Sequence, residues 1–145
     1  MDKQVTILIA EDDMGHASLI KKNLGRAGVT NPILHFKDGQ EILDFLFSDT
    51  ICKSPEDSYL LLLDIRMPKV DGITVLRKLK EDPKYKGLPV IMLTTTDDPK
   101  EIAECHNIGC STYVVKPIDY DLFIKAIVQL GLFFSVIEIP QLNVV

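Results

Sequence analysis

Five short apolar segments recur along the chain, and each is followed by a segment whose apolar residues have helical spacing. The five apolar segments are Val5–Ala10, Ile33–Phe36, Tyr59–Leu63, Pro89–Leu93 and Thr112–Val115. Short runs rich in Val, Ile and Leu are typical of strands, and runs that are apolar nearly throughout are typical of strands covered on both faces. The alternation therefore predicts an α/β domain built around a parallel sheet.

The segments that follow these strands carry the apolar positions of five helices. The residues expected on the five apolar faces are Ala17, Leu19, Ile20, Leu24 and Ala27; Ile42, Leu43, Phe45 and Leu46; Ile73, Val75, Leu76 and Leu79; Ile102 and Ala103; and Leu122, Phe123, Ala126, Ile127 and Leu130. The fourth helix is predicted to be shorter and more polar than the others. Gly28 follows the first helix, at a place where glycine is typical of a helix end.

The composition excludes several classes of function. A chain of 145 residues, with 46% hydrophobic and 26% charged residues, is typical of one soluble globular domain. A net charge of −5 disfavours binding to a phosphate backbone, so we expect no nucleic-acid partner. No apolar run approaches the length of a membrane span, and no leader precedes Val5, so we expect no membrane association.

The three cysteines predict neither a disulfide framework nor a metal site. Cys52, Cys105 and Cys110 are too few for a framework, and free thiols are typical of the cytoplasm. His106 lies between the last two, but the spacing matches no common zinc pattern and no second ligand pair is present. We therefore interpret these residues as structural and expect a cytoplasmic protein.

Chemically active side chains stand where four of the five predicted strands end. Glu11-Asp12-Asp13 follow the first strand, Asp64 follows the third, Thr94 the fourth and Lys116 the fifth. Functional crevices of doubly wound sheets lie outside the carboxyl ends of the strands. We therefore expect an acidic cluster, a hydroxyl and a lysine around one crevice.

This set of residues matches the requirements of phosphoryl transfer. A carboxylate can attack phosphorus and become an acyl phosphate, while Mg²⁺ binds both carboxylates and phosphate oxygens. Lysine and threonine can contact the remaining oxygens. Each residue alone has an ordinary explanation, since Glu11-Asp12-Asp13 could cap a helix and Asp64 could be a turn residue. The joint occurrence of all four groups favours a phosphoryl-accepting site.

The motifs together resemble the receiver domain family of two-component response regulators, over nearly all of residues 5–131. Asp64 and Thr94 are 30 positions apart, and Thr94 and Lys116 are 22 apart, as in that family. The motifs that carry the resemblance are Glu11-Asp12-Asp13, Asp38-Gly39, Leu62–Pro68, Asp71-Gly72, Leu88–Thr94, Gly109 and Tyr113–Pro117. The resemblance implies a flavodoxin-like, doubly wound (βα)5 fold with a five-stranded parallel sheet in the order 2-1-3-4-5.

The resemblance implies that Asp64 is the phosphoacceptor and that a magnesium ion lies beside it. Asp12 would be the main acidic ligand of Mg²⁺, and Glu11 would hold the ion largely through water. Asp64 itself and the backbone carbonyl of Arg66 would complete the protein ligands.

The resemblance also implies which residues bind the phosphoryl group and respond to it. Thr94 would donate a hydrogen bond to it, and Lys116 would pair with it. Tyr113 stands at an aromatic switch position, whose rotamer follows Thr94. Pro117 is expected to follow a cis peptide bond, which the X-Pro linkage makes accessible.

The implied function is that of a cytoplasmic regulator without an attached output domain. Such a protein is not an enzyme, and its only reactions are the gain and loss of its own phosphoryl group. Its partner would be a sensor histidine kinase or a phosphotransfer protein. A haloacid-dehalogenase-type phosphatase is disfavoured because it needs an Asp two residues after the nucleophile, where Arg66 stands. A receiver that works without phosphorylation is disfavoured by the intact set of site residues.

Residues 132–145 form an apolar extension beyond the predicted receiver domain of residues 1–131. This extension, the long polar loop Ser48–Ser58 and the Leu93-Thr94-Thr95 stretch resemble the regulators paired with bacterial phytochrome kinases, in which the tail helps to form a homodimer. An exposed run this apolar should pack against something. We therefore expect a homodimer, and the alternative is that the tail folds back on its own domain.

Overall fold

A parallel sheet forms the centre of the computed structural model, which describes residues 5–48, 58–95 and 98–137. Within these residues the strands are β1 (Val5–Ala10), β2 (Ile33–Phe36), β3 (Ser58–Asp64), β4 (Val90–Thr94) and β5 (Thr112–Val115). They lie in the order β2-β1-β3-β4-β5, and all neighbouring pairs are parallel. The predicted fold class and strand order are confirmed. The only boundary changes are that β3 gains one residue at each end, and β4 runs from Val90 to Thr94.

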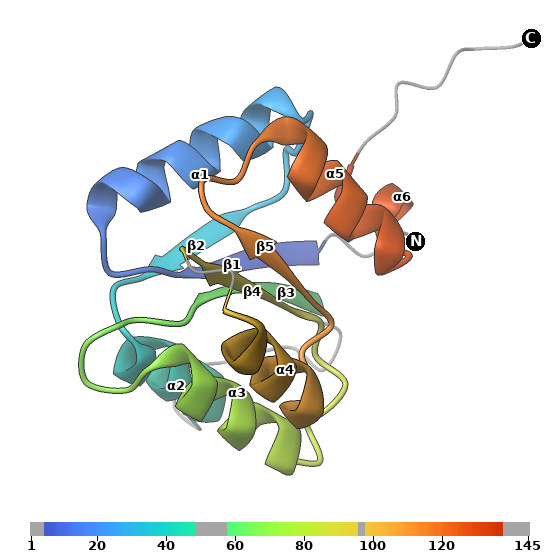
Figure 1. Ribbon diagram of the computed structural model, residues 1–145. Helices are drawn as coiled ribbons and strands as arrows, with labels where there is room; N and C mark the ends of the chain where they lie inside the picture. Colours follow the sequence, from blue (N-terminus) through green and yellow to red (C-terminus); the bar gives the residue numbers. More distant parts are fainter. Residues whose placement is uncertain (1–4, 49–57, 96–97, 138–145) are drawn as a thin grey trace, which may run out of the picture.

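Helices cover both faces of the sheet (Figure 1). α1 (Met14–Arg26) and α5 (Tyr120–Gln129) lie on one face, and α2 (Gly39–Phe47), α3 (Gly72–Glu81) and α4 (Pro99–Ile108) lie on the other. Successive side chains of a strand point to opposite faces. In β3, Leu60 and Leu62 therefore join the apolar core beneath α1 and α5, whereas Leu61 and Leu63 join the core beneath the other three helices. This double burial explains why the strand is apolar throughout.

An aspartate side chain caps the N-terminus of each of the helices α1 to α5, by accepting a hydrogen bond from a backbone N–H of the first turn. The capping residues are Asp13, Asp38, Asp71, Asp98 and Asp119. Each cap starts its helix a few residues beyond the carboxyl end of the preceding strand. The caps therefore fix the short loops at the edge of the sheet where the site residues were predicted.

Several predictions about the helices were wrong. Leu19 of α1 and Leu122 of α5 were expected on apolar faces, but the two residues are 43% and 39% exposed, because other residues form the buried stripes. α4 is not shorter than its neighbours, since it has ten residues, as does α3. Its polar character was predicted correctly, and Cys105 is its buried anchor in place of Ile102 and Ala103.

The first part of the C-terminal extension packs on its own domain. A short helix that the sequence analysis did not assign, α6 (Phe133–Val136), follows α5, and Val136 and Ile137 enter the core beneath α1 and α5. Ile137 forms an antiparallel bridge with Val29. The buried Asn31 donates from Nδ2 to the carbonyl oxygen of Val5 at 2.8 Å and to that of Ser135 at 3.3 Å. Residues 132–137 thus fold back on their own domain, which was the alternative to dimerisation in the sequence analysis.

Several sequence expectations concern residues outside the described ranges. These are the end of the extension (138–145), most of the Ser48–Ser58 loop, and Cys52. The homodimer expected from the extension therefore stays a prediction. Among the described residues, none of the helices combines the length and apolar character needed to cross a bilayer.

Candidate functional site

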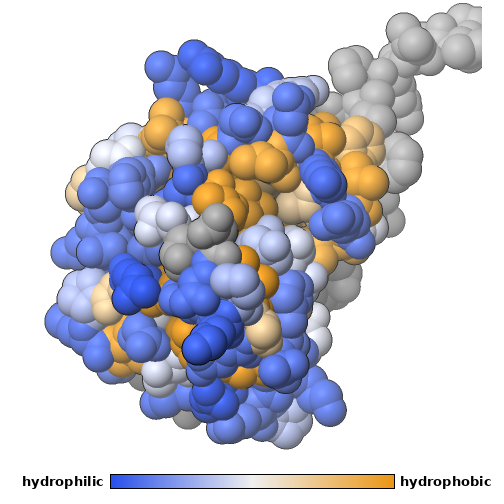
Figure 2. Space-filling view, viewed as in Figure 1, coloured by the Kyte–Doolittle hydropathy of each residue, from blue (hydrophilic) through white to orange (hydrophobic). Residues whose placement is uncertain are grey.

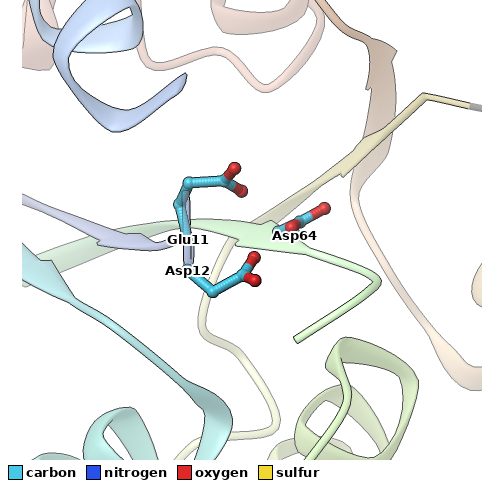
Figure 3. A group of neighbouring side chains, drawn as sticks. All are labelled: Glu11, Asp12 and Asp64. Carbon is cyan, nitrogen blue, oxygen red and sulfur yellow. The ribbon is translucent and has the colours of Figure 1, made fainter. Parts of the chain in front are cut away.

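Three carboxylates meet at the carboxyl ends of β1 and β3, as the sequence predicted (Figure 3). Glu11 and Asp12 follow β1, and Asp64 is the last residue of β3. One oxygen from each carboxylate lies within 4.8 Å of the others. Glu11 and Asp64 are buried, whereas Asp12 is exposed. Oxygen ligands gathered in this way, with one side open, fit a hard divalent cation such as Mg²⁺.

Asp13, the third member of the acidic run, has a different role. Its Oδ1 accepts a hydrogen bond from the backbone N–H of His16 at 3.0 Å and caps α1. This hydrogen bond lowers the pKa of Asp13 below its ordinary value. The helix-capping explanation that the sequence left open therefore holds for Asp13, whereas Glu11 and Asp12 belong to the carboxylate cluster.

Burial raises the pKa of Asp64 to about 7, and the neighbouring Glu11 carboxyl adds to this through a hydrogen bond and through its charge. Lys116 acts in the opposite direction but does not cancel the effect. Two carboxyl groups this close disfavour simultaneous ionisation. A cation in the cluster would relieve this repulsion and favour the ionised, nucleophilic form of Asp64.

Lys116 extends from the end of β5 into the same cluster. Its Nζ lies 2.8 Å and 2.9 Å from the two carboxylate oxygens of Glu11 and 3.4 Å from Oδ1 of Asp64. The Lys116–Pro117 peptide bond is cis, as predicted. A buried lysine bridging two carboxylates can neutralise part of their charge.

Thr94 and Tyr113 stand on neighbouring strands but face different surroundings. Thr94 is buried at the end of β4, at the same edge of the sheet as Asp64. Tyr113 pairs in register with Met92 of β4, and the residue is 37% exposed. Its ring packs edge-on against His106 of α4, with the centroids 5.5 Å apart. The aromatic side chain at the predicted switch position therefore faces outward in this structure.

Arg66 lies in the β3–α3 loop and lines an open pocket of about 590 Å³ together with Asp12. Its guanidinium reaches α4, where Nη2 lies 3.2 Å from Oε2 of Glu101. The guanidinium is thus paired with α4, and the metal-binding role of the Arg66 backbone carbonyl stays a prediction.

Two glycines let helices approach the backbone of this loop. A Cβ on Gly72 would lie 2.0 Å from the carbonyl oxygen of Asp64, and a Cβ on Gly39 would lie 1.9 Å from that of Val70. Both distances are far below any van der Waals contact, so each position requires glycine. Lys69 reinforces this arrangement through an ion pair with Asp38 at 3.5 Å. The starts of α2 and α3 therefore hold the β3–α3 loop, which follows Asp64, in place.

The sequence analysis missed two histidines of the site. His16 Nδ1 lies 3.1 Å from Oε1 of Glu11 and 3.3 Å from Nζ of Lys116. His35 Nε2 lies 2.7 Å from the backbone oxygen of Glu11. Only their positions in the sequence could have indicated these two histidines. His16 falls in the first turn of the helix that follows the acidic run, and His35 lies near the end of β2, the strand beside β1.

The two cysteines in the described part of the chain have the properties of structural residues. Cys105 and Cys110 are free and buried, and burial raises the pKa of both thiols, that of Cys110 to about 11. Thiols with raised pKa values are poor nucleophiles and poor metal ligands. His106 Nδ1 lies 3.8 Å from Sγ of Cys110.

Comparison with known proteins gives consistent matches. The protein-family model described as the response regulator receiver domain matches residues 7–128 of this chain. The crystal structure of a response regulator receiver domain from Rhodospirillum rubrum is 47% identical and covers 94% of this chain and 97% of its own, with a TM-score of 0.73. The bacteriophytochrome response regulator RtBRR is 32% identical, covers 97% and 84% of the two chains, and has a TM-score of 0.79.

A third similar protein has been solved with a metal ion. Response regulator Rcp1 of Synechocystis is 27% identical over 110 residues, which span 76% of this chain and 75% of Rcp1. The crystal structure of its Mn²⁺-bound form covers 92% of this chain and 96% of its own, with a TM-score of 0.70.

Proposed function

The chain belongs to the response regulator receiver domain family, a signalling module of two-component systems, and we propose that it accepts its phosphoryl group on Asp64. The observation that carries this proposal is the position of the Asp64 carboxylate, which is buried at the end of β3 between Glu11 and Lys116. A buried carboxylate surrounded by acidic and basic partners has the groups that phosphoryl transfer needs for positioning and charge balance.

In the proposed reaction, an oxygen of Asp64 attacks the phosphorus atom of a phosphohistidine. The P–N bond to the donor breaks as the P–O bond to Asp64 forms, and the histidine leaves with the electron pair. Lys116 is close enough to transfer from the carboxylates to a phosphoryl oxygen, and Thr94, at the end of the adjacent strand, would donate its hydroxyl to a second oxygen.

The residues proposed to hold Mg²⁺ are Glu11, Asp12, Asp64 and the backbone carbonyl of Arg66. The three carboxylates fit this role because their oxygens converge within 4.8 Å. The Mn²⁺-bound form of Rcp1 supports a divalent cation in this family. When bound, such an ion neutralises charge on the phosphoryl oxygens and on the carboxylates.

The output of the proposed switch is a change of surface. Phosphorylation adds charge and strong acceptors beside Thr94 and Lys116, and the move of Thr94 would let Tyr113 turn inward. Apolar surface gathers over α5 and the adjoining β5, whereas hydrophilic surface covers most of α3 and α4 (Figure 2). Exposed residues of this apolar region are Val115, Leu122 and Val128. A partner that contacts this region would sense the rotation of Tyr113.

The proposed phosphodonor is a sensor histidine kinase or a phosphotransfer protein, and the likeness to RtBRR favours a phytochrome kinase. We propose a cytoplasmic homodimer, with free thiols at Cys105 and Cys110, which forms with the help of the 132–145 extension. Neither nucleic acid nor a membrane is among the proposed partners, and the proposed turnover is limited to the protein's own phosphoryl group.

Mapping of the modified residue tests the assignment of Asp64. The protein is phosphorylated by a purified histidine kinase and reduced with borohydride, which converts an aspartyl phosphate to homoserine. Peptide sequencing by mass spectrometry should find homoserine at position 64. Homoserine at another aspartate, such as Asp12 or Asp13, would overturn the proposal.

A further inference from the structure

We propose that His16 is a positioning residue of the phosphoryl site, which holds the buried Glu11 carboxylate in place when Lys116 leaves it for the phosphoryl group. This inference rests on the proposed function, because it assigns a role in the phosphorylated state. In the unphosphorylated state Lys116 already donates hydrogen bonds to both oxygens of the Glu11 carboxylate, so the hydrogen bond from His16 is not needed there.

The position of His16 is fixed by the start of α1. Its backbone N–H donates to Oδ1 of Asp13, the cap of the helix, at 3.0 Å. This contact brings the half-exposed imidazole over the end of β1, where Nδ1 lies 3.1 Å from Oε1 of the fully buried Glu11 carboxylate. The ring is therefore held by the helix and does not depend on Lys116.

The contact between His16 and Glu11 has one possible direction when the carboxylate is ionised. Oε1 of an ionised carboxylate can only accept, so the hydrogen in the 3.1 Å contact lies on Nδ1 of His16, which donates it. Lys116 donates to Oε1 and Oε2 of the same carboxylate at 2.8 Å and 2.9 Å, and its Nζ also lies 3.3 Å from Nδ1. The imidazole is therefore a second donor to Glu11 beside the lysine.

The contribution of His16 grows when Lys116 moves. Transfer of Nζ to a phosphoryl oxygen takes two hydrogen bonds from a carboxylate that has no exposed surface. Loss of these two hydrogen bonds destabilises a buried carboxylate, and the proposed Mg²⁺, held by Glu11 largely through water, would offset part of this loss. The hydrogen bond from His16 remains on it, whereas His35 contacts only the backbone oxygen of Glu11. His16 thus lowers the cost of the phosphorylated arrangement.

The test compares His16→Ala, His16→Asn and His16→Gln in the full chain, with beryllofluoride and Mg²⁺ as the phosphoryl mimic. The amide nitrogen of asparagine takes the place of Nδ1, whereas that of glutamine corresponds to Nε2. We expect His16→Ala and His16→Gln to bind beryllofluoride about tenfold more weakly, as for loss of a hydrogen bond to a charged group. His16→Asn should stay close to wild type. The melting temperatures without beryllofluoride should be equal in all four proteins.

Each other outcome is decisive. Wild-type affinity in His16→Ala would overturn the inference, as would a failure of asparagine to restore it. A lowered melting temperature of ligand-free His16→Ala would show a merely structural role and would also overturn it. Failure of the wild-type protein itself to bind beryllofluoride, with its fold intact, would remove the proposed phosphoryl function together with this inference, so the two failures are distinguishable.

Discussion

Nζ of Lys116 lies closer to both carboxylate oxygens of Glu11, at 2.8 Å and 2.9 Å, than to Oδ1 of Asp64, at 3.4 Å. The lysine is thus bound mainly to a proposed metal ligand, and only secondarily to the proposed phosphoacceptor. In this structure the charge of Lys116 therefore compensates the acidic cluster, and the proposed phosphorylation would have to redirect the lysine.

Replacement of Lys116 should destabilise the fold. Lys116→Ala leaves the buried Glu11 carboxylate beside Asp64 without its cation, which typically costs about 3–5 kcal/mol. Urea unfolding at pH 7.5 without metal measures the change. The exposed Lys22→Ala is the control and should shift the free energy of unfolding by less than about 0.5 kcal/mol. A Lys116→Ala protein as stable as this control would contradict the described ion pair.

The raised pKa of Asp64 predicts a pH dependence of stability in metal-free protein. Because the pKa rises from 3.8 to about 7, the native state keeps a proton that the unfolded chain releases, so stability falls as pH rises through this range. Asp64→Asn removes the titrating group and should be more stable than wild type at pH 7.5, by about 1–3 kcal/mol. The difference should disappear near pH 4. Equal differences at both pH values would show that the carboxyl group is not responsible.

Gly72 should tolerate no side chain. In Gly72→Ala the new Cβ would meet the carbonyl oxygen of Asp64 at 2.0 Å, so the loop after β3 must move. We expect a loss of about 1–3 kcal/mol in the free energy of unfolding and slower phosphorylation, measured by denaturation and by phosphate incorporation. Gly87→Ala is the matched control, because nothing lies within 4 Å of its Cβ. Similar effects in both variants would refute a specific role of Gly72.

Two truncations separate the roles of the C-terminal extension. A chain that ends at Gly131 loses Val136 and Ile137 from the core and should be destabilised by about 2–5 kcal/mol. A chain that ends at Ile137 keeps both core residues and should avoid this loss. If residues 138–145 form the dimer contact, light scattering should show a monomer for this second chain. A dimer that persists in the second chain would contradict that role.

The fold could be predicted from the sequence because strands buried on both faces leave an unmistakable pattern, as in Leu60–Leu63. The strand order came from the resemblance to a family, since periodicity does not say which strands pair. α6 was missed because the apolar tail has no cap or periodicity, and its burial depends on Val29 and Asn31, which lie more than 100 positions away in the sequence.

The site was predictable to the level of residue types at strand ends, but not to the level of individual contacts. Glu11, Asp12 and Asp13 look equivalent in the sequence, and only the start of α1 separates the helix cap from the two residues of the cluster. His16 carries no motif, and its contact with Glu11 depends on where the first turn of α1 places it. The proposed roles of Asp64, Thr94, Lys116 and Tyr113 stay predictions.

The most direct test of the account is the intact mass of the protein after treatment with acetyl phosphate and Mg²⁺, with Asp64→Asn measured beside the wild type. The account predicts one phosphoryl addition to the wild type, which requires the metal ion and is absent from the folded variant. The same addition on Asp64→Asn would contradict the account, and so would a folded wild-type protein that takes up no phosphoryl group from either acetyl phosphate or a phosphorylated kinase.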